Sequence, residues 1–261
     1  MPRVWNVAVT ALSLVAGAIL FARFGPFMPF LEPAQPHAHG HDDLVIRIDV
    51  SPGMGSTESF FFEPPDLVVT GDGTAYTPSE GPRTGIVAPV VSHDLGEGRL
   101  QNLLKRAHHD GLLADHPTYD APADVYDGST TDVLLATDHG RWTHRAYALG
   151  ARGWGFSDRD RLFDFVSDAL AEGGGRPSTM AGPDALRVMT EQGVAPDGAG
   201  GVATWPHDAS VSPAEIGDCM VVHDPAVVRA LTTAPEQYYR QGGRTYSVAA
   251  AVPLPGDWCG G

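Results

Sequence analysis

The sequence contains little cysteine, little lysine and few basic residues of any kind. Its 261 residues include two cysteines, and Lys105 is the only lysine among 17 basic residues, against 32 acidic ones. A formal charge of −15 excludes a nucleic-acid binder that works by neutralising phosphates. Two cysteines are too few for a disulfide-dense scaffold or a four-cysteine zinc site. At 43% hydrophobic residues, the chain is nevertheless too apolar for general disorder.

Common catalytic motifs are also missing from the sequence. The segment Gly53-Met54-Gly55-Ser56 lacks the Gly-x-Ser-x-Gly spacing of a nucleophile elbow. There is no Gly-Lys pair for a phosphate-binding loop and no His-Glu-x-x-His zinc motif. We therefore predict no catalytic residue and no resident cofactor. The alternative is an envelope hydrolase with an Asp/His site that these motifs do not describe.

The amino terminus contains a long apolar run. Residues Val4–Ala22 are 19 positions without a charge, preceded by Arg3 and followed by Arg23. A helix of this length rises about 28 Å, close to the hydrocarbon thickness of a bilayer. We expect a signal anchor at residues 1–24 that spans the membrane once, with the carboxyl-terminal domain outside the cytoplasm. A cleaved signal peptide and a secreted protein are the alternative.

Residues 25–43 form a linker rich in proline and histidine. Because no periodicity survives in this segment, we expect an extended chain. His37, His39 and His41 alternate within it, and neutral imidazoles are good ligands for zinc, copper or nickel. These three histidines are the predicted metal site, and a polar spacer that binds no metal is the alternative.

Beyond the linker, the patterns predict an α+β fold with a mainly antiparallel sheet and about three helices, preceded by the amino-terminal hydrophobic helix. Leucines at i, i+3 and i+4 predict a helix from Leu100 toward Gly111, and Asp224-Pro225 predicts the start of another. The third predicted helix spans about residues 158–172. The predicted strands are residues 44–50, 59–62, 67–70, 75–76, 132–137, 141–149, 186–190, 220–222 and 245–252.

We expect one α+β unit that consists of two subdomains. Residues 44–172 hold two hairpins and two helices, residues 173–184 form a Gly/Pro connection, and residues 185–261 form a smaller α+β subdomain. Cys219 and Cys259 are expected to form a disulfide that closes the smaller subdomain, because an exported chain usually pairs its two cysteines.

Four short motifs follow one another in a recognisable order. They are Gly71-Asp72-Gly73-Thr74 after an apolar strand, the Leu-rich helix from Leu100, Tyr147-Ala148-Leu149-Gly150, and Pro253-Leu254-Pro255 before Cys259. This order resembles an uncharacterised family of secreted or membrane-anchored, often lipoprotein-like proteins of high-GC Gram-positive bacteria, over most of the chain after residue 43. This chain lacks the lipid-acceptor cysteine of such members, and the resemblance implies no activity for any residue.

These features together predict a noncatalytic extracytoplasmic domain that binds a ligand or has a structural role. Its expected partners are the membrane, through the amino-terminal helix, and an envelope protein or ligand. Nucleic acid is not an expected partner. The alternatives are the envelope hydrolase and a metal-binding protein that uses the tail with His37, His39 and His41.

Overall fold

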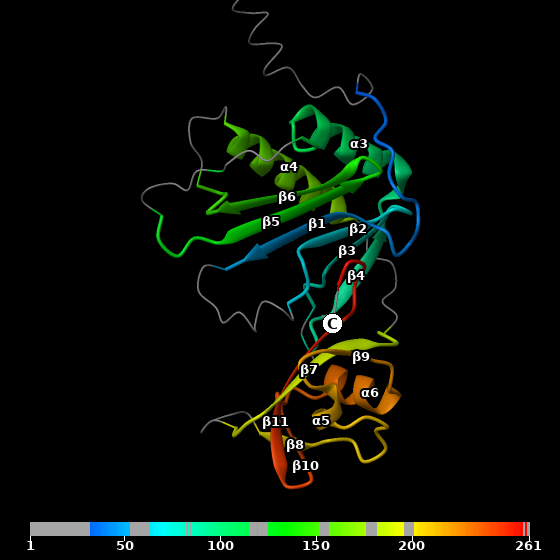
Figure 1. The fold of residues 1–261 in the computed structure, drawn as a ribbon, viewed down its shortest axis with the longest axis vertical. Helices are drawn as coiled ribbons and strands as arrows, with labels where there is room; N and C mark the ends of the chain where they lie inside the picture. Colours follow the sequence, from blue (N-terminus) through cyan, green and yellow to red (C-terminus); the bar gives the residue numbers. More distant parts are fainter. Residues whose placement is uncertain are drawn as a thin grey trace, which may run out of the picture. The chain divides into compact units, whose positions relative to one another are not determined.

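The computed structural model describes residues 32–52, 63–81, 83, 85–114, 119, 125–151, 157–175, 182–195, 201–257 and 259. Within these ranges the chain has an α+β fold with mainly antiparallel sheets and four helices (Figure 1). The predicted fold class is thus confirmed, with one helix more than expected. The predicted amino-terminal helix and the predicted strand at residues 59–62 lie outside the described residues. No helix in the described ranges combines the length and the apolar character needed to cross a membrane.

The amino-terminal half forms a six-stranded sheet in the order β4-β3-β2-β1-β5-β6, and all neighbouring strands are antiparallel. The strands are β1 (Leu44–Ser51), β2 (Leu67–Thr70), β3 (Thr74–Pro78), β4 (Val90–Asp94), β5 (Thr130–Thr137) and β6 (Gly140–Tyr147). The order follows from short local connections, because tight turns join β2 to β3 and β5 to β6. The turn between β5 and β6 pairs Thr137 with Gly140 and joins the two strands predicted at residues 132–137 and 141–149.

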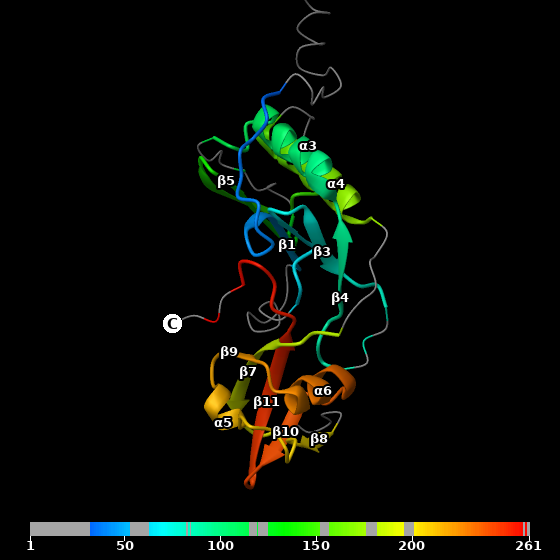
Figure 2. The ribbon, with the colours of Figure 1, turned by 90° about the vertical axis from the view of Figure 1, so that its right-hand side faces the viewer.

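Two helices cover one face of this sheet. Helix α3 (Gly96–His109) and helix α4 (Asp158–Gly173) lie side by side (Figure 2). Each presents an apolar stripe at helical spacing to the sheet, and the two stripes join one continuous core. The buried helix residues of this core are Leu100, Leu103, Leu104, Ala107, Leu162, Phe165, Val166 and Ala169. Truncating a fully buried leucine of this set to alanine would cost about 2–5 kcal/mol.

The carboxyl-terminal tail packs on strand residues that face away from this helix-covered core. Side chains alternate across a strand, so Val68 belongs to a separate small cluster with Leu44 and Leu254 of the tail. Leu44 joins this cluster because a register shift between Leu44 and Ile46 interrupts the alternation of β1. Asp257 then accepts a hydrogen bond from Arg47 of β1 at 2.7 Å. The tail is thus held by both apolar and charged contacts.

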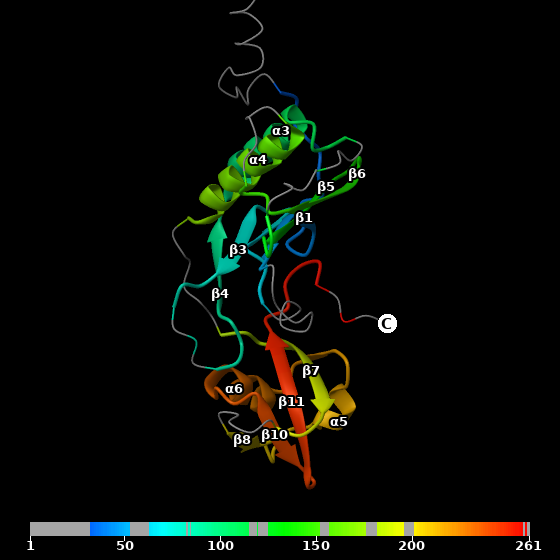
Figure 3. The ribbon, with the colours of Figure 1, turned by 90° about the vertical axis from the view of Figure 1, so that its left-hand side faces the viewer.

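The carboxyl-terminal half forms a five-stranded sheet in the order β8-β10-β11-β7-β9. Figure 3 shows β11 between β7 and β10, and β11 is antiparallel to both. Strand β8 runs parallel to β10. The elements are β7 (Leu186–Gln192), β8 (Val202–Thr204), α5 (Pro213–Ile216), β9 (Met220–Val222), α6 (Pro225–Thr233), β10 (Tyr238–Gln241) and β11 (Arg244–Ala251). A second apolar core includes Trp205, Ile216 and Leu231 and is separate from the first.

The compact unit that contains both sheets begins at Ala34. Residues 34–43, the second half of the predicted linker, therefore lie within the unit. We call residues 34–43 the docked segment. The predicted subdomain boundaries at residues 172 and 185 stay a prediction.

Candidate metal centre

The docked segment runs over the first turns of α3 and the end of β2. Gln35 and His37 are buried, with exposed fractions of 5% and 2%, whereas His39 and His41 are exposed. Exposed and buried residues alternate from Ala34 to Ala38, because successive side chains of an extended chain point in opposite directions. The alternation ends there, and His39 and His41 are exposed although an unbroken extended chain would place them on the face of His37. The three predicted ligands therefore lie in different environments.

Gln101 of α3 holds the start of the docked segment. Its side-chain Oε1 accepts a hydrogen bond from the backbone N–H of Gln35 at 3.0 Å, and its Nε2 donates to the Gln35 carbonyl at 2.9 Å. The next carbonyl, that of Pro36, accepts from the backbone N–H of Asp138 at 2.9 Å. These bonds satisfy backbone groups that a strand partner would otherwise satisfy, and they place His37 over α3.

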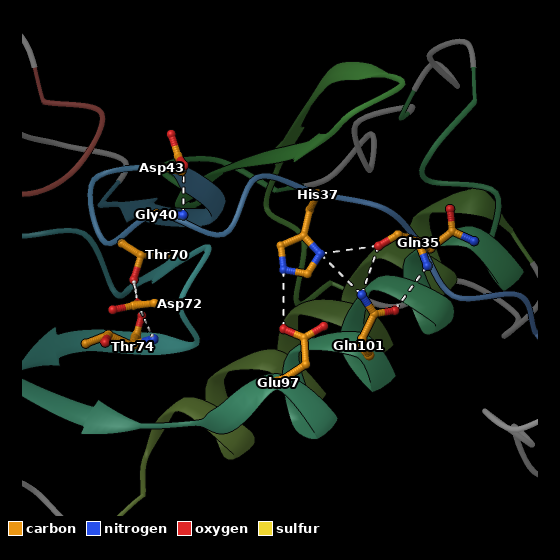
Figure 4. Close-up of polar contacts among 9 residues, drawn as sticks. All are labelled: Gln35, His37, Gly40, Asp43, Thr70, Asp72, Thr74, Glu97 and Gln101. Carbon is orange, nitrogen blue, oxygen red and sulfur yellow. Dashed lines mark hydrogen bonds and ion pairs between the residues drawn. The ribbon is translucent and has the colours of Figure 1, made fainter.

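Three side chains with metal-binding atoms converge beside Gln101. One nitrogen each of His37 and His39 and one carboxylate oxygen of Glu97 all lie within 4.8 Å of one another. The His37 Nε2 atom is 3.5 Å from Glu97 Oε2, and the rings of His37 and His39 are 4.6 Å apart between centroids. Figure 4 shows the His37 ring between Glu97 on one side and Gln35 and Gln101 on the other.

His37 is oriented as a metal ligand would be. Its Nδ1 lies 3.3 Å from the Gln35 carbonyl oxygen and 3.2 Å from Gln101 Nε2. In the tautomer that donates its Nδ1 proton to the carbonyl, the Nε2 lone pair faces Glu97 and is free to bind a metal ion, whereas in the tautomer that accepts from Gln101 at Nδ1, an Nε2 proton faces Glu97. Among the described residues Nε2 has no hydrogen-bond partner, although the His37 side chain is fully buried. A buried nitrogen without a hydrogen bond is uncommon in a folded protein.

Glu97 comes from the first turn of α3, where the helix dipole favours a carboxylate. Its side chain is 54% exposed, so the cluster opens to solvent on this side. Glu97 was not predicted as a ligand, because it follows His37 by 60 residues and no motif links the two positions. The available signal was an acidic residue in the first turn of a helix, which is too common to single out a metal site.

Two imidazoles and one carboxylate suit zinc and its neighbours in the first transition series. Tetrahedral zinc with three protein ligands keeps a fourth position for water or an external ligand. The neighbouring groups of His37 also match the usual arrangement, in which a metal-bound histidine donates its other ring proton to a carbonyl. The cluster therefore offers three suitable ligand atoms to one divalent ion.

His41 lies outside this cluster. Its Nδ1 is 2.9 Å from Asp72 Oδ2, and its Nε2 is 2.9 Å from the Tyr76 hydroxyl. Asp72 also accepts from the Thr70 hydroxyl at 2.7 Å and from the Thr74 backbone N–H at 3.0 Å, which closes the turn between β2 and β3. The structure thus brings two of the three predicted histidines together and uses the third to attach the docked segment to the sheet.

The Asp72–His41–Tyr76 chain is the arrangement here that most resembles the hydrolase alternative. The hydrogen bond from Thr70, and then that from His41, hold the pKa of Asp72 well below its usual range. Burial, and then the negative charges of Asp72 and Asp42, raise the pKa of Tyr76. A tyrosine whose pKa is raised is a poor nucleophile near neutral pH. The His41 side chain is also 59% exposed, so these three hydrogen-bonded side chains lack the features of an activated catalytic site.

The two cysteines form the predicted pair. Cys219 precedes β9, Cys259 lies in the tail, and their sulfur atoms are 2.02 Å apart. Cys219 is therefore not a metal ligand. Comparison of the chain with protein-family models, with curated proteins and with solved structures found no match. An account of function therefore depends on the geometry of the sites themselves.

Proposed function

We propose that this chain is a noncatalytic, extracytoplasmic domain that binds a divalent transition-metal ion through His37, His39 and Glu97. The observation that carries the proposal is the buried His37 Nε2 atom, which has no hydrogen-bond partner in the described part of the chain and faces two further ligand atoms. A bound ion would remove the unfavourable free energy of leaving this buried atom without a hydrogen bond.

The acidity of the domain supports the choice of a cation as ligand. The chain carries 32 acidic and 17 basic residues, and only three of the acidic residues precede Leu44. The surrounding negative potential would raise the local concentration of divalent cations. Histidine ligands favour zinc, copper and nickel over magnesium or calcium, which prefer oxygen ligands.

The disulfide supports an oxidising compartment. Disulfides persist in exported proteins and are rare in the reducing cytosol. Together with the uncharged run Val4–Ala22, the pairing of Cys219 with Cys259 supports a domain outside the cytoplasm, anchored in the membrane by residues 1–24. Secretion after cleavage is the alternative. The fourth coordination position would be open to a ligand or to a side chain of an envelope protein.

Isothermal titration calorimetry of the full chain in mild detergent with ZnCl₂ tests the metal site. We expect one ion per chain, and we expect that His39→Ala and Glu97→Gln each weaken binding at least tenfold, because each removes one ligand. The matched controls are His207→Ala and Glu191→Gln, which change exposed residues of the other half of the chain. CuCl₂ and NiCl₂ titrations then rank the metals.

The variant His41→Ala separates this site from the site predicted from sequence. If zinc binding needs His41 as much as His39 and does not need Glu97, the ion binds to the histidine-rich tail instead of the cluster with Glu97. Absence of zinc binding in the unmodified chain contradicts both sites.

Cell fractionation with protease treatment of intact cells tests the location. The domain should be cleaved from outside and should be recovered with the membrane fraction, and deletion of residues 1–24 should remove it from that fraction. Protection of the domain and recovery in the soluble cytosol would contradict the proposed location.

A further inference from the structure

The three proposed metal ligands come from two separate parts of the chain. His37 and His39 belong to the docked segment, whereas Glu97 belongs to α3. One ion would therefore cross-link the beginning of the compact unit to a helix that follows 60 residues later. Such a cross-link would strengthen the attachment of the docked segment to α3 and would add positive charge beside Glu97.

The remaining contacts of the docked segment are polar. Gln35 and His37 are its only buried residues, and neither is apolar. Hydrogen bonds hold the segment through Gln35 to Gln101, through Pro36 to Asp138 and, at its other end, through His41 and through the Asp43 carbonyl. Hydrogen bonds of this kind each contribute little net stability, because water replaces them when the segment detaches. Ordering ten residues opposes them through lost conformational entropy.

The position of both imidazoles depends on close contact between the segment and the sheet. A Cβ added to Gly71 would overlap the carbonyl oxygen of Ala38 and would lie 2.7 Å from its carbonyl carbon. Ala38 stands between His37 and His39, so anything that displaces it moves both ligands. The Gly71 backbone N–H also donates to the Asp43 carbonyl at 2.8 Å. Metal binding and docking therefore require the same backbone arrangement.

We infer that the metal ion acts as a clasp that regulates the attachment of the docked segment, so that ion binding and docking form one coupled equilibrium. This inference rests on the proposed function. Because coupling is reciprocal, an ion that stabilises docking must bind more tightly when docking is favoured by other contacts. Release of residues 34–43 would lengthen the connection to the preceding residues by about 35 Å at full extension.

Amide hydrogen exchange of the full chain, with ZnCl₂ or with EDTA, measures the coupling directly. We expect that saturating zinc slows amide exchange in residues 34–43 by about tenfold or more. This factor is typical of the coupling between two linked binding equilibria. Exchange in β7 and β11 of the second sheet provides the internal control and should not change. Equal exchange of the segment with and without zinc overturns the clasp, even if calorimetry shows that zinc binds.

Two substitutions outside the ligand set test the reciprocal effect. Gly71→Ala should displace Ala38 and weaken zinc binding about tenfold with an unchanged stoichiometry. Its matched control is Gly98→Ala on α3, next to Glu97, where an added Cβ meets nothing within 4 Å. This control should bind zinc as the unmodified chain does. Tyr76→Phe, which removes the hydroxyl bonded to His41, is the milder second variant and should weaken binding about threefold.

The outcomes distinguish the two proposals. If the unmodified chain binds no zinc, the proposed function fails and the clasp fails with it. If the unmodified chain binds zinc while Gly71→Ala and Tyr76→Phe bind it equally well, the metal site stands and the clasp fails. A circular dichroism spectrum identifies a Gly71→Ala protein that does not fold, in which case Tyr76→Phe decides.

Discussion

Gln101 holds Gln35 by both of its backbone groups, so one side chain on α3 takes the place of a neighbouring strand. Gln35 is 5% exposed, and its N–H and carbonyl have little access to water. The pair fixes the register of the docked segment against α3 and thereby places His37 over Glu97.

Replacing Gln101 with alanine should lower the free energy of unfolding by about 1–3 kcal/mol, because two buried backbone groups lose their bonds to the Gln101 side chain. Urea unfolding of the metal-free chain, followed by circular dichroism, measures the change. Asn102→Ala, at the next and exposed position of the same helix, is the matched control. It should be neutral or slightly stabilising, because alanine is the better helix former. Equal effects of the two substitutions would show that the Gln35 pair contributes nothing specific.

Loss of the disulfide should destabilise the domain through the unfolded state. Cys219 and Cys259 are separated by 40 residues, and for a loop of this length the chain-entropy model gives about 4 kcal/mol as an upper expectation. The double variant Cys219→Ser/Cys259→Ser should therefore unfold at lower urea concentration than the oxidised chain. Adding a reductant should lower the stability of the unmodified chain by a similar amount and leave the double variant unchanged. A double variant as stable as the oxidised chain would contradict the role of the bridge.

Local signals predicted the helices and long strands best. Helix α4 begins at Asp158, as predicted, and Ser157 caps it through a capping box with Asp160. Asp224 caps α6, as its Asp-Pro sequence predicts. Helix α3 begins at Gly96, four residues before the predicted start. Its first turn contains two glycines and no side-chain cap, so the usual start signals are missing.

The sequence patterns missed three short strands. Strands β4, β8 and β10 have five, three and four residues, too few for a period-two pattern to emerge. Strand β8 becomes a strand only because β10, more than 30 residues later, pairs with it in parallel. The same limit applies to the metal centre. Residue type identified His37 and His39, whereas Glu97 joins them only through the packing of the segment on α3.

Acid should weaken the start of α6. Hydrogen bonds from the Ser210 hydroxyl and backbone, followed by those from Ala226 and Val227, lower the pKa of Asp224 to about 2. Because the folded pKa lies below the unfolded value of about 3.9, this stabilisation is present above pH 4 and is lost as pH falls toward 2. Asp224→Ala should cost about 1 kcal/mol at pH 7.

The neutral cap Asp224→Asn isolates the contribution of charge. It keeps an acceptor at the cap, so the difference in unfolding free energy between it and the unmodified chain should shrink between pH 5 and pH 2. Urea unfolding at each pH measures this difference. Asp218→Asn, the same change at an exposed position, is the control. A difference for Asp224→Asn that stays constant with pH would mean that its charge does not contribute.

Tyr239 buries a hydroxyl group in the second core. Its side chain is 1% exposed and packs edge-on against Trp205, with ring centroids 5.5 Å apart. In the described part of the chain the hydroxyl has no hydrogen-bond partner. Burial, and then the charge of Glu236, raise the pKa of Tyr239 to about 12. The ring therefore contributes packing, whereas the hydroxyl opposes folding.

Tyr239→Phe should accordingly leave the free energy of unfolding unchanged or raise it by about 1 kcal/mol at pH 7. The folded pKa is higher than the unfolded value of about 10, so the unmodified chain should lose stability between pH 10 and pH 12 as the unfolded state ionises first. The phenylalanine variant lacks the part of this loss that Tyr239 causes. Thermal unfolding at pH 7 and pH 11 measures both effects, with the half-buried neighbour Tyr238→Phe as control. Destabilisation by Tyr239→Phe at pH 7 would show that the hydroxyl has a stabilising partner and would contradict this account of the second core.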